Sequence, residues 1–136
     1  MCRHVLGGTV GWGSRAGGGA AGVGAGRRVV GLEGEGSALC LMQGLWKQAR
    51  EGLDVTTVIV SNRRYAILQG EMTAVGANLG PAAQELFNLD RPATDWQSIA
   101  KGFGIPATQA TDMESFVDQL NRANAGDGPR LIELMI

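Results

Sequence analysis

Residues 28–37 read Arg-Val-Val-Gly-Leu-Glu-Gly-Glu-Gly-Ser, and residues 55–65 read Val-Thr-Thr-Val-Ile-Val-Ser-Asn-Arg-Arg-Tyr. Each stretch is an apolar run that ends in a polar turn. Glu35 in the first turn and Asn62 in the second lie 27 residues apart, about one strand–helix–strand unit. In a parallel sheet such a unit places two strand ends side by side. The two turns are therefore predicted to meet at one edge of the sheet.

The predicted meeting of these turns indicates a kind of ligand. Glu35 offers a carboxylate and Asn62 offers an amide oxygen, next to backbone groups at the start of a helix. Oxygen ligands beside a helix N-terminus suit a magnesium ion that carries phosphates.

The remainder of the chain alternates between strand and helix patterns. A helix before Gly52 is indicated by apolar residues at helical spacing, namely Ala38, Leu41, Met42, Leu45, Trp46 and Ala49. A third segment, about 65–88, suggests a helix that Gly80-Pro81 interrupts. Trp46 and Trp96 are expected in the core, and Cys40 is expected to be a buried small residue.

The C-terminal part has clearer end signals. Asp95 is a plausible N-cap of a helix that ends before Gly104. Residues 105–110 suggest a short strand, and Thr111 with Glu114 forms a capping-box pattern before another helix. Residues 130–136 close the chain as a strand. The predicted class is α/β, a parallel sheet flanked by helices, in one domain.

Composition limits the function classes. The formal net charge of the 136 residues is −1, so no basic surface for nucleic acid or an anionic membrane is expected. No run of about 18 apolar residues is present, and a membrane span is not expected. The two cysteines form no disulfide framework, which favours a reducing, cytoplasmic location. We divide the chain into a degenerate Gly-rich segment, 1–26, and a domain, 27–136.

Residues 31–68 resemble the C-terminal domain of thiamine diphosphate enzymes. The resemblance rests on Glu35-Gly36-Ser37-Ala38-Leu39, on Gln48-Ala49-Arg50-Glu51-Gly52-Leu53 and on the stretch from Asn62 to Leu68. It extends through residues 90–92 and 128–133, and more weakly back to Gly7-Gly8. The similar families are acetolactate synthase large subunits and benzoylformate-decarboxylase-like proteins. The resemblance implies a thiamine diphosphate-binding fold, truncated to one domain.

The resemblance also implies roles for individual residues. Mg²⁺ would be bound by Glu35, the Asn62 side chain and the Arg64 carbonyl. Two diphosphate oxygens and a water molecule would complete its octahedral coordination. Thiamine diphosphate would contact a wider set, namely Gly8 (a carbonyl to the aminopyrimidine), Val10 (an apolar wedge), Gly34, Gly36, Ser37, Asn62, Tyr65, Ala66 and Ile67. No residue of this chain is expected to be catalytic.

Several residues depart from the family's pattern. The family has Asp where this chain has Glu35, whose side chain is longer by about 1.5 Å. Ser61 replaces the first of two asparagines, while the ligand Asn62 is kept. This chain has Gly17-Gly18-Gly19 where the family has an Ala-rich helix. Compared with three alanines, the three glycines lower the helix propensity by roughly 3 kcal/mol.

In the resembling family a partner domain supplies the glutamate that activates the aminopyrimidine, and this chain is expected to lack that domain. We therefore expect this chain to carry half of a cofactor site and to be inactive alone. It would need a separate pyrimidine-binding chain, or it would form a homo-oligomer. One alternative is a non-catalytic interaction domain that dimerises through the old interface. A weaker one is a dinucleotide-binding oxidoreductase, because Gly17, Gly19 and Gly22 match that fingerprint, although no strand precedes them.

Overall fold

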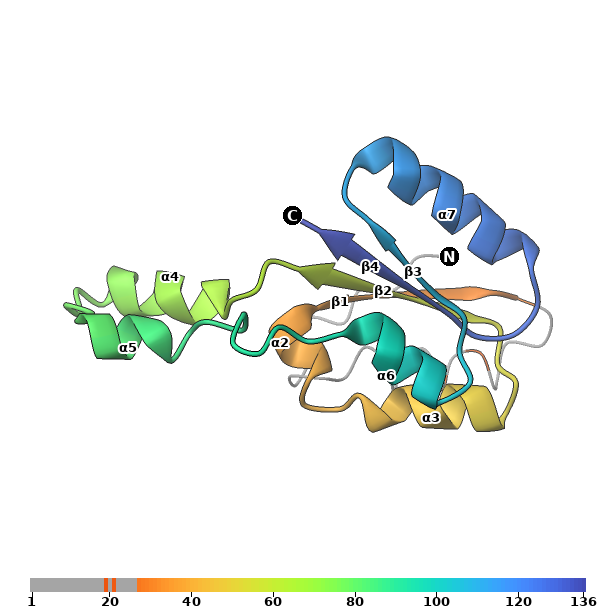
Figure 1. Cartoon of the computed structure of the whole chain (residues 1–136), viewed down its shortest axis with the longest axis horizontal. Coiled ribbons are helices and arrows are strands. Elements are labelled where there is room, and N and C mark those ends of the chain that lie inside the picture. Colours follow the sequence, from red (N-terminus) through yellow and green to blue (C-terminus); the bar gives the residue numbers. More distant parts are fainter. Residues whose placement is uncertain (1–18, 20, 22–26) are drawn as a thin grey trace.

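The computed structural model describes residues 19, 21 and 27–136. Within them, four strands form one parallel sheet, in the spatial order β1 (Val29–Gly34), β2 (Val55–Ser61), β4 (Arg130–Met135) and β3 (Ala107–Ala110). Helices lie on both faces of this sheet, as Figure 1 shows: α3 (Gln43–Arg50) and α6 (Trp96–Gly102) on one side, and α7 (Met113–Ala125) on the other. The predicted class, a parallel α/β sheet flanked by helices, is confirmed.

The elements follow the sequence patterns closely. In chain order they are β1 (Val29–Gly34), α2 (Glu35–Ala38), α3 (Gln43–Arg50), β2 (Val55–Ser61), α4 (Ala66–Ala74), α5 (Pro81–Glu85), α6 (Trp96–Gly102), β3 (Ala107–Ala110), α7 (Met113–Ala125) and β4 (Arg130–Met135). The predicted Gly-rich segment 1–26 lies outside the described residues, apart from Gly19 and Ala21.

The ends of α6 and α7 test two predicted caps. The Asp95 carboxylate accepts a hydrogen bond from the Ser98 N–H at 2.9 Å, so the predicted cap of α6 is confirmed. The capping box that begins at Thr111 is wrong. Asp112 is the N-cap of α7 and accepts from the Ser115 N–H at 2.8 Å. The Asp112 carboxylate, one residue after Thr111, accepts the hydrogen bond from the free N–H groups in the first turn of α7 in place of the threonine hydroxyl.

The predicted helix before Gly52 is divided into α2 and α3. Between them the chain makes tight turns, with Cys40 N–H bonded to the Ser37 carbonyl at 3.2 Å. This break changes which positions face the sheet, because the helical phase restarts at α3. Two predictions are consequently wrong: Cys40 is exposed, and Trp46 is 49% exposed with the Arg50 guanidinium 5.1 Å from its ring centroid.

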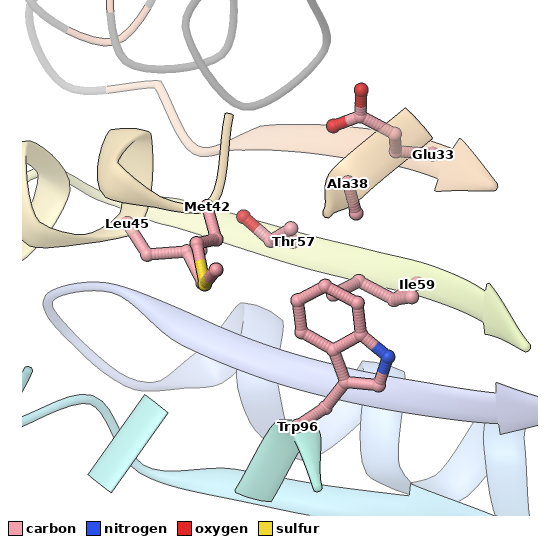
Figure 2. A pocket seen from close by; sticks show the side chains of 7 residues that line it. All are labelled: Glu33, Ala38, Met42, Leu45, Thr57, Ile59 and Trp96. Carbon is pink, nitrogen blue, oxygen red and sulfur yellow. The ribbon is translucent and has the colours of Figure 1, made fainter. Parts of the chain in front are cut away.

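The core lies between the sheet and the layer of α3 and α6. Trp96 is fully buried there, as predicted, and packs in one cluster with Leu45 and Ile59. Figure 2 shows its indole ring against Ile59 of β2, with Leu45 and Met42 on the far side of a small gap. This cavity of about 10 Å³ has room for one water at most, so it is packing space rather than a binding site.

The segment between β2 and α6 forms an arm that extends beyond the sheet, made of α4 and α5 (Figure 1). Gly80 and Pro81 start α5, because proline suits the first turn of a helix. Neither helix contains a buried residue. Large apolar side chains are exposed along the arm, namely Ile67, Leu68, Met72, Val75 and Leu86. No helix in the described part of the chain is both long and apolar enough to cross a membrane.

Candidate functional site

The turns that follow β1 and β2 meet at the carboxyl edge of the sheet. Parallel pairing places Gly34 opposite Val60, so the next residues of both strands are neighbours. The Arg63 N–H donates a hydrogen bond of 2.8 Å to Glu35 Oε2. This contact confirms that the turns around Glu35 and Asn62 lie side by side.

Glu35 is a buried carboxylate with an unused oxygen. The residue is 1% exposed, and its Oε1 atom has no hydrogen-bond partner among the described residues. Burying a carboxylate without full pairing is costly, so a cation at Oε1 would stabilise it. Among the described residues no three acidic, histidine or cysteine side chains converge. A metal here would therefore rest on Glu35 together with neutral oxygens and oxygens of its ligand.

The second turn is held in a defined shape. Asn62 Oδ1 accepts a hydrogen bond from the Arg64 N–H at 3.1 Å. The Tyr65 N–H donates to the Phe87 carbonyl at 2.8 Å, and the Leu89 N–H donates to the Arg63 carbonyl at 2.8 Å. These bonds fasten the turn to the segment that returns from the arm, so its backbone is fixed before any ligand binds.

Gly36 and Ser37 contact neighbouring side chains at the start of α2. A Cβ on Gly36 would lie 2.4 Å from Tyr65 Cε1, so the tyrosine ring packs directly on this glycine. The Ser37 hydroxyl donates to Glu33 Oε1 at 3.0 Å. With four residues, α2 is too short to have a large dipole, and individual N–H groups are its useful donors.

In the described part of the chain, the other predicted cofactor-binding residues make no contact that supports or contradicts their predicted role. Gly34 precedes α2 as its N-cap, while Ala66 and Ile67 begin α4 with exposed side chains. Gly8 and Val10 lie outside the described residues.

Sequence reasoning missed a polar cluster next to this site. Glu133 of β4 is 1% exposed and accepts hydrogen bonds from the side chains of Gln97 and Gln109. The Arg63 guanidinium lies 3.6 Å from Glu133 Oε1, so this side chain is turned inward. The signal that would have revealed the cluster was a lone carboxylate within the apolar run of residues 131–136.

Two hollows of the described chain are lined by residues other than the proposed metal ligands. A wider groove of about 640 Å³ runs along β3 and is lined by residues of α6, α7 and β4. Neither this groove nor the small core cavity is lined by Glu35, Asn62 or Arg64. Both hollows therefore lie away from the two turns.

Comparison with known proteins identifies the family. The sequence pattern described as "Thiamine pyrophosphate enzyme, C-terminal TPP binding domain" matches residues 3–134. The chain belongs to this family. The thiamine diphosphate-binding fold expected from the resemblance is thereby confirmed.

Individual relatives agree with this assignment. A Mycobacterium tuberculosis protein named as an acetolactate synthase large subunit, IlvX, is 46% identical over 134 residues, which is 97% of this chain and 26% of the relative. Benzoylformate decarboxylase of Pseudomonas aeruginosa is 32% identical over 108 residues, or 79% of this chain and 19% of that protein.

A solved structure shows the same fold. The thiamine diphosphate-dependent 4-hydroxybenzoylformate decarboxylase of Rhodococcus jostii RHA1 superimposes with a TM-score of 0.82 at 31% identity, covering 91% of this chain and 22% of the other. The chain thus spans about a fifth to a quarter of the length of the proteins it matches.

Proposed function

We propose that this domain binds thiamine diphosphate through a magnesium ion held by Glu35, the Asn62 side chain and the Arg64 carbonyl. The observation that carries the proposal is the buried Glu35 Oε1 atom, for which the described part of the chain offers no hydrogen-bond partner. A divalent cation at this atom would supply the missing charge. Magnesium suits the oxygen donors of the two turns and usually keeps water and phosphate oxygens as further ligands.

The chain's own residues would have distinct tasks. Glu35 would neutralise the cation, and the rigid second turn would present Asn62 and Arg64. N–H groups of Gly36 and Ser37 would donate to the diphosphate, and the ring of Tyr65 would limit the space above Gly36. When bound, thiamine diphosphate supplies the electron sink for cleavage or joining of carbon–carbon bonds next to a carbonyl.

We propose further that catalysis needs a second protein surface. One observation supports this: the arm exposes Ile67, Val75 and Leu86 at 80%, 75% and 78%. Apolar exposure of this kind marks interfaces. The second surface would belong to a pyrimidine-binding chain or to another copy of this one. The reaction would be that of a carboligase or 2-oxoacid decarboxylase.

Titration calorimetry with thiamine diphosphate tests the binding proposal. We expect binding in the presence of Mg²⁺ and its loss on addition of a chelator. Absence of binding at millimolar cofactor with excess Mg²⁺ would contradict the proposal. It would leave the second candidate, a non-catalytic interaction domain, which the exposed arm also favours.

Assays of pyruvate and benzoylformate decarboxylation test the need for a second surface. We expect no turnover above that of free thiamine diphosphate by the isolated chain, because general acid–base groups must lie within hydrogen-bond reach of the cofactor. Turnover that appears only after a pyrimidine-binding chain is added would support the proposal. Turnover by the isolated chain would refute it.

A further inference from the structure

Arg63 has a backbone conformation that residues other than glycine rarely adopt. Its φ is +57°, and it is the one non-glycine residue with positive φ in the described part of the chain. An L side chain is disfavoured in this region, and such a conformation persists where surrounding contacts hold it. Since Arg63 stands between the proposed ligands Asn62 and Arg64, its conformation determines the shape of the metal-binding turn.

Contacts hold every part of Arg63. Its N–H donates to Glu35 Oε2 at 2.8 Å, and its carbonyl accepts from the Leu89 N–H at 2.8 Å. Its guanidinium Nη2 lies 3.6 Å from Glu133 Oε1 and 3.8 Å from the sulfur of Met135. The side chain is therefore directed toward Glu133 and Met135 of β4.

Glu133 requires a counterion at this position. It is 1% exposed, and its Oε2 accepts from Gln97 of α6 at 3.2 Å and from Gln109 of β3 at 2.9 Å. Its Oε1 has no hydrogen-bond partner among residues 27–136, and the Arg63 guanidinium lies 3.6 Å from it. A buried carboxylate is tolerated when it is paired and hydrogen-bonded. The need to pair Glu133 thus draws the Arg63 side chain inward.

We propose that the half-buried Arg63 and the buried Glu133 form an anchor that positions the magnesium-binding turn. The ion pair fixes the side chain of Arg63, and with it the left-handed backbone that directs the Arg63 N–H to Glu35. Both are positioning residues in this proposal, because the proposed metal ligands are Glu35, Asn62 and Arg64. The role in magnesium binding rests on the proposed function. The contact between Arg63 and Glu133 is present in the ligand-free chain and does not depend on that function.

The anchor predicts a specific change in metal requirement. Groups that orient metal ligands typically change metal affinity by about 10–100-fold when they are removed. We expect Arg63→Met and Glu133→Gln each to raise the Mg²⁺ concentration for half-maximal thiamine diphosphate binding by about tenfold. The double variant should be no worse than either, since the two residues act as one unit. Arg63→Lys, which keeps the charge, should recover part of the loss.

A direct contact of Arg63 with the diphosphate predicts a different result. In that case Arg63→Met would weaken cofactor binding even at saturating Mg²⁺, whereas Glu133→Gln would not change it. That outcome would overturn the anchor. Lys101→Ala and Glu114→Gln remove exposed charges of the same types on α6 and α7, and serve as controls that should bind like the parent.

Amide hydrogen exchange in the ligand-free chain tests the anchor without any cofactor. Glu133→Gln and Arg63→Met should speed exchange at residue 63 and at Leu89, while amides of the β2–β4 pairing keep their protection. Unchanged exchange at residue 63 and Leu89 would overturn the inference whatever the binding data show. If the parent itself binds no cofactor, the proposed function fails, and with it the purpose assigned to the anchor. Faster exchange in the variants would then still establish the anchor.

Discussion

Replacing Glu35 by glutamine should make the metal-free chain more stable and remove its response to magnesium and cofactor. The carboxylate is 1% exposed. One of its oxygens accepts a hydrogen bond from the Arg63 N–H, and the other has no hydrogen-bond partner in the described part of the chain. The amide oxygen of glutamine can keep the contact with the Arg63 N–H. The variant then buries an unpaired neutral group where the parent buries an unpaired charged oxygen. We expect a gain of about 1 kcal/mol in the free energy of unfolding, at the lower end of unsatisfied-group penalties.

Thermal unfolding with and without ligand measures both effects. A gain of about 1 kcal/mol corresponds to a rise of about 3–5 °C in Tm for a chain of this size. Magnesium and thiamine diphosphate at 100 times Kd should stabilise the parent by about 2.7 kcal/mol and the variant not at all. The order of the two Tm values should therefore reverse when ligand is added. Glu114→Gln, an exposed glutamate on α7, is the matched control and should follow the parent.

Two results would refute this reasoning separately. A ligand-induced shift of normal size in Glu35→Gln would mean that Glu35 is not a metal ligand. A metal-free variant less stable than the parent would mean that the buried oxygen does not carry the cost assigned to it.

Three further predictions concern Gly36, the arm and the cap of α6. Gly36→Ala should lower the free energy of unfolding by about 1–3 kcal/mol, because its Cβ would lie 2.4 Å from Tyr65 Cε1. Gly36→Ala with Tyr65→Ala should cost less than the sum of the two single changes, and additivity in thermal unfolding would contradict the contact. Replacing Ile67 and Val75 on the arm by serine should lower the mass measured by light scattering while changing unfolding by less than about 0.5 kcal/mol, and a monomeric parent would rule this out. The hydrogen bond from Ser98 lowers the pKa of Asp95, so the stability that this cap adds at neutral pH should be lost as the pH falls below about 3.9. Asp95→Asn keeps a cap that does not titrate and should lose less stability between pH 7 and pH 3 than the parent does.

Much of the fold is predictable from local patterns. The apolar runs before the Glu35 and Asn62 turns became β1 and β2, and their spacing correctly placed the two turns together. Asp95 and Gly104 marked the ends of α6, because caps and left-handed glycines are decided by a few neighbouring residues. The site residues Glu35 and Arg63 were brought into contact by strand register, which the hydrophobic pattern specifies.

The sequence by itself determined the element types, the parallel pairing and the meeting of the two turns, because each depends on short-range residue patterns and chain connectivity. Only the tertiary structure decided which side of a helix faces the core and which partners the ends of long side chains contact. A break between α2 and α3 turned Trp46 outward, although its spacing suited a buried face. The direction of the Arg63 side chain was likewise decided only in the folded chain. Its direction depends on Glu133, 70 residues later, and the energy of a buried charge is set by partners that only the folded chain brings together.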